Sequence, residues 1–137
     1  MKRLGLAGRI RQVFEPEAML PAAGQGALGI EVRTDRADVA AALAPLAHWP
    51  TWLGVAAERA VSRAMGGSCS MPLAAFSRWR DGLLHIDAAW GDEVGTQALV
   101  RASAQASVAT LAQAEALGQS VAAQLCAAEI GRASCRE

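Results

Sequence analysis

The chain has 137 residues, of which 53% are hydrophobic and 19% are charged, so it can bury the core of one modest domain and is not a disordered protein. Its thirteen basic residues balance thirteen acidic ones, which argues against a nucleic-acid-binding protein because such a protein needs a basic face. No apolar run in the sequence reaches the length of a membrane span, no secretory signal is recognisable, and three cysteines are too few for a disulfide scaffold. We therefore expect a cytoplasmic protein with no nucleic-acid or membrane partner.

Residues 1–45 contain pieces of structure that cannot fold alone. Residues 1–12 are typical of the end of a helix, because no capping residue opens them. After an irregular, proline-containing segment, apolar and other residues alternate in 25–33, which predicts a half-buried strand, and Asp35 is placed to cap a helix at 38–47. A lone strand needs a sheet to join, so we infer that this third belongs to a larger protein whose earlier residues are absent. The apolar face of the predicted strand consists of Leu28, Ile30 and Val32.

Two further helices are predicted between residues 50 and 128. Thr51 is positioned to cap the first, which Gly66 and Gly67 end, and the second begins near Ser107. Apolar residues recur at helical spacing in both and should face a common core. These residues are Leu53, Ala57, Ala60, Val61, Ala64 and Met65 in the first helix, and Leu111, Ala114, Leu117, Val121 and Leu125 in the second.

Three strands are predicted between these helices, at residues 73–79, 84–90 and 98–102. Asp81 and Gly82 form a two-residue hairpin signal, because both central positions of a type I′ turn need positive φ. The expected fold class is therefore α+β, with a small antiparallel three-stranded sheet covered on one face by helices.

The last nine residues break the helical pattern. Residues 129–137 have the sequence that a translated sequencing adapter would give. We expect this segment to be an artefact, in which case Cys135 has no biological meaning.

The loop that follows the first of these two helices holds Cys69, the main candidate for a reactive side chain. Cys69 follows Gly66, Gly67 and Ser68, which allow the backbone to turn tightly or to approach a ligand. Two interpretations stay open: a reactive thiol, or a small buried cysteine beside a helix end. A zinc site is not expected, because the two cysteines left after Cys135 is set aside and the two scattered histidines make a poor set of zinc ligands.

Four other positions are weaker candidates. Gln25 lies between Gly24 and Gly26 just before the predicted strand, where it can offer an amide to a ligand or simply open the strand. Arg3 has the chemistry to bind a carboxylate, although a solvated helix end explains it equally. Glu58 can anchor the Cys69 loop or lie exposed. Cys126, near the end of the last helix, is expected to serve packing.

Three motifs resemble the C-terminal part of the porphobilinogen deaminase (hydroxymethylbilane synthase) family. They are residues 3–6, residues 20–33, and the segment from Glu58 and Arg59 through residues 66–73. The resemblance covers residues 1–128. Met71 departs from the family pattern, which usually has a β-branched residue there.

The resemblance implies a transferase of tetrapyrrole (porphyrin and heme) biosynthesis. The family joins four porphobilinogen units into hydroxymethylbilane and releases ammonia. It implies that Cys69 holds a dipyrromethane cofactor through a thioether, supported by the Gly66, Gly67 and Ser68 loop, because a thiolate is a good nucleophile toward the electrophilic methylene of porphobilinogen. Gln25 and Gly26 would line the cofactor cleft. Arg3 would pair with substrate carboxylates.

The resemblance also implies a division into domains. Residues 1–45 would hold the tail of an α/β domain 2 and the returning strand and helix of an α/β domain 1, and residues 46–128 would form the cofactor-cysteine domain. The family's general-acid aspartate lies in N-terminal regions absent here, so we expect no catalytic residue in this chain and no turnover by it alone. Its partners would be porphobilinogen and those missing domains.

Two other classes of function stay open from the residues alone. One is a noncatalytic α+β module that binds small anionic ligands or a partner subunit. The other is a cysteine hydrolase, which requires His48 or His85 within hydrogen-bond reach of Cys69.

Overall fold

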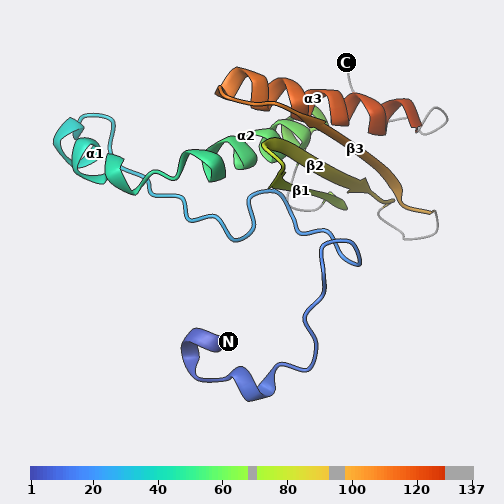
Figure 1. The fold of residues 1–137 in the computed structure, drawn as a ribbon, viewed down its shortest axis with the longest axis horizontal. Helices are drawn as coiled ribbons and strands as arrows, with labels where there is room; N and C mark the ends of the chain where they lie inside the picture. The colour runs from blue at the N-terminus through green and yellow to red at the C-terminus, as the bar shows by residue number, and fades with distance from the viewer. Residues whose placement is uncertain (68–70, 93–97, 129–137) are drawn as a thin grey trace.

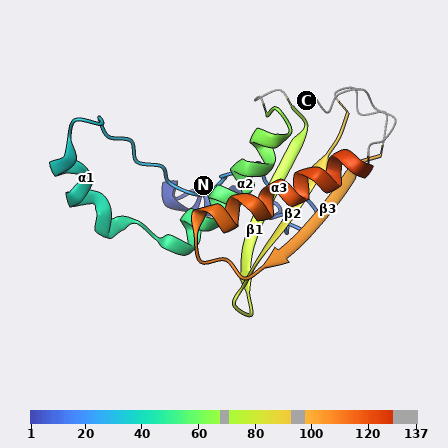
Figure 2. The same ribbon diagram turned by 90° about the horizontal axis from the view of Figure 1, so that it is seen from above.

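The computed structural model describes residues 1–67, 71–92 and 98–128. Its C-terminal part has two layers, a three-stranded sheet and two helices that cover one face of it (Figures 1 and 2). The elements are the 3-10 helices η1 (Lys2–Leu4), η2 (Ala7–Arg9) and η3 (Ala44–Leu46), the helices α1 (Ala37–Leu43), α2 (Trp49–Ala64) and α3 (Leu111–Ala128), and the strands β1 (Leu73–Arg80), β2 (Leu83–Trp90) and β3 (Val100–Ala106). The α+β fold class predicted from the sequence is confirmed.

The sheet is antiparallel with the order β1-β2-β3, so each strand pairs with its neighbour in the chain. Asp81 (φ 50°) and Gly82 (φ 76°) form the tight turn between β1 and β2, which confirms the hairpin prediction. β3 extends to Ala106, beyond the predicted end at residue 102, because Ala104 and Ala106 continue the pairing with β2. Alternating alanines give too weak a hydrophobic contrast to mark the end of this strand from sequence.

The core lies between the sheet and the pair α2 and α3. The helical stripes predicted from the sequence are confirmed except at Ala64 and Leu111, which are exposed. Gly118 lets α3 approach α2 closely, since a Cβ there would lie 2.2 Å from the carbonyl oxygen of Ala57. The largest fully buried side chains are Leu84, Ile86, Leu125, Val61 and Val121.

Both helix starts differ from the prediction. α2 begins at Trp49 with His48 as its N-cap residue, because Pro50 fits the first turn of a helix, and the Thr51 hydroxyl instead lies 2.8 Å from the His48 ring. α3 begins at Leu111, where Thr110 and Gln113 exchange side-chain-to-backbone hydrogen bonds. This reciprocal pair is a capping box, which satisfies backbone donors that the first turn of the helix leaves free.

The N-terminal third differs most from the prediction. The helix end at 1–12 is wrong, since two separate 3-10 helices form there, and no strand forms within residues 1–67. Leu28, Ile30 and Val32 are 96%, 60% and 38% exposed, because a strand needs a neighbouring strand to bond with and this segment has none. The predicted helix at 38–47 is confirmed as α1 and η3. Asp35 does not cap it, because its carboxylate pairs with Arg33.

Candidate functional site

Two glycines with positive φ shape the loop around Gln25. Gly24 has φ +75° and Gly26 has φ +85°, values that favour glycine over all other residues. The loop is closed by hydrogen bonds from the Gln25 N–H to the Ala22 oxygen (3.1 Å) and from the Ala27 N–H to the Gly24 oxygen (3.3 Å). We call this segment the 22–27 turn. The turn leaves Gln25 exposed, so the amide side chain is available to a ligand.

A buried carboxylate on α2 holds the 22–27 turn in place. Glu58 is only 6% exposed, and its Oε2 accepts a hydrogen bond from the backbone N–H of Gly24 at 2.7 Å. Its Oε1 accepts two more, from the backbone N–H and the hydroxyl of Ser77 on β1, both at 2.7 Å. The sequence analysis expected Glu58 to anchor the Cys69 loop or to lie exposed; it is instead buried and binds the 22–27 turn and β1, whereas Arg59 is exposed.

The loop that carries Cys69 starts where α2 ends. Gly66 has φ +73°, and the Gly67 N–H donates to the Ser62 oxygen at 2.7 Å, so both glycines end the helix as predicted. Ser68 and Cys69 lie outside the described residues, and their predicted roles stay predictions. The chain is described again from Met71, which leads through Pro72 into β1.

Two hollows flank residues 16–22, which cross the face of the sheet that α2 and α3 do not cover. We call residues 16–22 the crossing segment. The smaller, of about 340 Å³, brings together Ala22 at the start of the 22–27 turn and Met71 and Pro72 at the exit of the Cys69 loop, with Arg101 on its border. Two motifs that are distant in sequence therefore border one partly apolar space. The larger hollow, of about 510 Å³, lies beside the smaller one, and its lining includes Arg78, Asp87 and Arg101.

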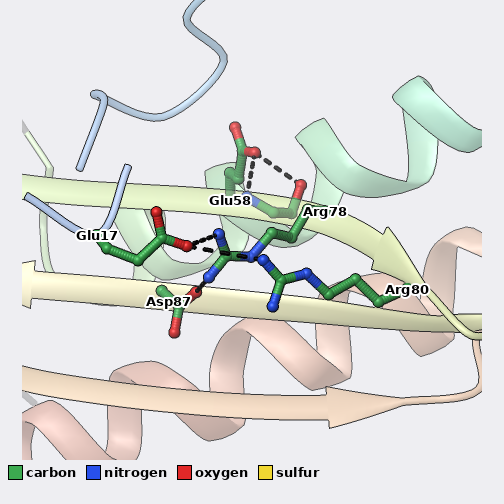
Figure 3. A network of polar contacts seen from close by, with 6 residues as sticks. Glu17, Glu58, Arg78, Arg80 and Asp87 are labelled. Carbon is green, nitrogen blue, oxygen red and sulfur yellow. Dashed lines mark hydrogen bonds and ion pairs between the residues drawn. The ribbon is translucent and has the colours of Figure 1, made fainter. Parts of the chain in front are cut away.

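An ion-pair network on the open face of the sheet holds this crossing segment (Figure 3). The Arg78 guanidinium bonds Glu17 and lies 3.0 Å from the Asp87 carboxylate, while Arg80 lies 3.7 Å from Glu17. The pKa of Glu17 lies below its ordinary value. The first cause is a hydrogen bond from the backbone N–H of Glu17 itself, and the second is a hydrogen bond from the Arg78 side chain. Sequence reasoning missed this network. The only signal was that Arg78, in the predicted strand 73–79, and Arg80, directly after it, lie two positions apart and would share one face if the strand continued.

The remaining candidates lie apart from the 22–27 turn. Arg3 is exposed in η1, at the N-terminal end that Figure 1 shows away from the sheet. His48 precedes the 16-residue α2, about 24 Å from the helix end that leads to Cys69. His85 lies five positions before Trp90, which pairs with the start of β1, and five residues of strand span about 17 Å. Cys69 lies outside the described residues, so the Cys–His nucleophile pair stays a prediction.

Cys126 lies near the end of α3 and contacts Met65, which follows the end of α2. Its Sγ lies 3.6 Å from the Met65 sulfur, and the cysteine takes part in a disulfide, which the sequence analysis did not predict. Within the described part of the chain, no three metal-binding side chains are grouped as a metal site would require. None of the described helices combines the length and the apolar character needed to cross a membrane.

Comparison with known proteins gives two family matches that follow one another along the chain. Residues 1–41 match the family model "Porphobilinogen deaminase, dipyromethane cofactor binding domain", and residues 52–127 match "Porphobilinogen deaminase, C-terminal domain". The two segments thus correspond to different domains of one kind of protein.

Similar curated proteins carry the same name. The porphobilinogen deaminase of Albidiferax ferrireducens is 67% identical over 128 residues, which are 93% of this chain and 41% of that protein. Those of Ralstonia nicotianae and Paraburkholderia phytofirmans are 60% and 56% identical and cover 91% of this chain, but the chain covers only 37% and 36% of them. This chain therefore spans about two fifths of the length of these relatives, and with a family match over more than half of its residues it belongs to the porphobilinogen deaminase family.

Proposed function

We propose that this chain is the C-terminal part of a cytoplasmic transferase that condenses four porphobilinogen units into hydroxymethylbilane and releases ammonia. Besides family membership, one observation carries the proposal. Ala22, at the start of the 22–27 turn, and Met71 and Pro72, at the exit of the Cys69 loop, border the same hollow of about 340 Å³. Gln25 and Gly26 follow Ala22 in the turn, and Cys69 precedes Met71 in the chain, so the hollow lies beside the two segments to which the resemblance assigns the cofactor.

The described residues fit a dipyrromethane cofactor attached to Cys69. The hollow has apolar walls at Met71, Pro72 and Leu73 that suit flat pyrrole rings, and the exposed Arg101 on its border has the chemistry to pair with pyrrole carboxylates. When bound, this cofactor supplies the anchored primer to which substrate units are added. Gln25 and Gly26 would orient it from the turn.

The chain requires the rest of the enzyme for turnover. General acid catalysis needs a positioned proton donor, which the resemblance places in N-terminal domains that this chain does not contain. The exposed apolar side chains of Leu28, Ile30 and Val32 support a partnership with those domains, because they are spaced to complete a sheet. Arg3 would then contribute to the binding of substrate carboxylates in the assembled enzyme.

A hybrid enzyme tests the proposal. Residues 1–128 of this chain replace the matching segment of the Albidiferax ferrireducens relative, and hydroxymethylbilane formation from porphobilinogen is measured. We expect the hybrid to be active, Cys69→Ser to be inactive, and the matched control Cys126→Ser to keep its activity. We expect the isolated chain to form no product. An active Cys69→Ser hybrid would refute the assigned cysteine, and turnover by the isolated chain would refute the missing-acid argument.

A further inference from the structure

Glu58 is the one buried charged side chain among the residues that the structure describes. A carboxylate is costly to bury unless hydrogen bonds replace its water, and here three donors do so. The donors come from two places, the 22–27 turn through Gly24 and β1 through Ser77. One side chain on α2 thus joins three segments of the fold.

The 22–27 turn depends on this contact because its own sequence fixes it poorly. Gly24 and Gly26 have the largest conformational freedom of any residue type, and the turn has only two internal hydrogen bonds. Within it, Ala23 packs against the core, while the Gly24 N–H points to Glu58 Oε2. The position of the exposed Gln25, next in the chain, follows from these two anchors.

We propose that Glu58 is a positioning residue, whose carboxylate clamps the 22–27 turn to α2 and β1 so that Gln25 and the helix leading to Cys69 are held as one unit. The importance of this clamp for the cofactor rests on the proposed function. The clamp itself rests only on the hydrogen bonds and the burial of Glu58.

The site requires a carboxylate and excludes its amide. All three partners donate hydrogen bonds, and a carboxylate is a pure acceptor with two equivalent oxygens. A glutamine side chain has one oxygen, and its NH₂ group would face either the Gly24 N–H or the Ser77 donors. Glu58→Gln therefore keeps size and shape but must break one side of the clamp.

Nuclear magnetic resonance of the full 137-residue chain tests the clamp. Because one carboxylate binds both amides, we expect slow amide hydrogen exchange at Gly24 and at Ser77 in the unmodified chain. Glu58→Gln should speed exchange at Gly24 or at Ser77 at least tenfold, because the amide can satisfy only one side of the clamp, and this rise should exceed any change at the core residue Leu84. The matched control Glu115→Gln removes an exposed carboxylate that pairs with Arg63 and should leave exchange at Gly24 and Ser77 unchanged.

A second variant keeps the test decisive if Glu58→Gln does not fold. Ser77→Ala removes one hydroxyl donor and should leave amide exchange at Gly24 unchanged, because Gly24 binds the other oxygen. Unchanged exchange at both Gly24 and Ser77 in a folded Glu58→Gln chain, or faster Gly24 exchange in Ser77→Ala, would overturn the proposal. An inactive hybrid with unmodified Cys69 would instead overturn the proposed function, without altering the exchange at Gly24.

Discussion

The Glu58 carboxylate accepts a hydrogen bond from the Gly24 backbone at 2.7 Å, although 34 positions of sequence separate the two residues. Through this contact the segment before α1 becomes part of the α2 and sheet unit. The structure therefore ties a family motif in the N-terminal third to the helix that leads into the predicted cofactor loop.

Removal of the Glu58 side chain should destabilise the fold. Glu58→Ala leaves the partly buried Gly24 N–H and two Ser77 donors without their acceptor, so we expect the free energy of unfolding to fall by about 2 to 4 kcal/mol. Urea denaturation measures this difference. Glu115→Ala, which removes an exposed ion pair, should cost less than about 1 kcal/mol. Equal effects of the two substitutions would contradict the assigned role of Glu58.

Gly118 should tolerate no side chain. The Cβ of Gly118→Ala would lie 2.2 Å from the Ala57 carbonyl oxygen and 2.8 Å from the Ala60 Cβ, so α2 and α3 would have to separate. We expect a loss of about 1 to 3 kcal/mol in unfolding free energy, measured by thermal or urea denaturation. Gly8→Ala is the control, because nothing lies within 4 Å of a Cβ at that position. A Gly118→Ala chain as stable as the control would show that the helices do not pack this closely.

The contact of Glu17 with the open sheet face should weaken in acid. Folding lowers the pKa of Glu17 from its ordinary value of 4.5, first through its own backbone N–H and then through Arg78. The stabilisation is therefore fully present above 4.5 and is lost as the pH falls through the lowered pKa. Carboxyl carbon resonances followed against pH should give Glu17 a midpoint below the ordinary value. Arg78→Ala should return this midpoint only part of the way to the ordinary value, because the backbone hydrogen bond remains. A midpoint that Arg78→Ala leaves unchanged would show that the ion pair does not form in solution.

The segment around Ile30 should be unprotected in the isolated chain. Its apolar side chains are exposed and its backbone pairs with no strand, so we expect amide hydrogen exchange across residues 28–32 at rates close to those of an unfolded peptide. In the hybrid enzyme the same amides should be protected at least a hundredfold. Slow exchange in a monomer of the isolated chain would contradict the need for a partner sheet.

Local patterns in the sequence predicted the sheet and the helices that cover it, whereas contacts between residues far apart in the sequence could not be predicted from such patterns. Alternation around Leu84 and Ile86, and the turn at Asp81 and Gly82, depend on neighbours in sequence, and all were predicted correctly. The Glu17–Arg78 contact spans 61 positions, and no local period marks it.

The failures of prediction have equally specific causes. The alternation of residues 28–32 marks a face of a strand, but pairing requires a neighbouring strand, and none of the described residues supplies one for this segment. At the start of α2, the preference of Pro50 for the first helical turn outweighs the capping preference of Thr51. For the site, the turn glycines and the end of α2 were predicted. That Glu58 binds the turn required the three-dimensional structure.

The mass of the peptide that contains Cys69 tests the central claim most directly. The hybrid enzyme is purified from cells that make porphobilinogen, reduced, unfolded and digested. Reduction removes any disulfide, which matters because Cys126 takes part in one, whereas a thioether survives it. We predict a Cys69 peptide heavier by one dipyrromethane. An active hybrid whose Cys69 peptide has its unmodified mass would contradict the account.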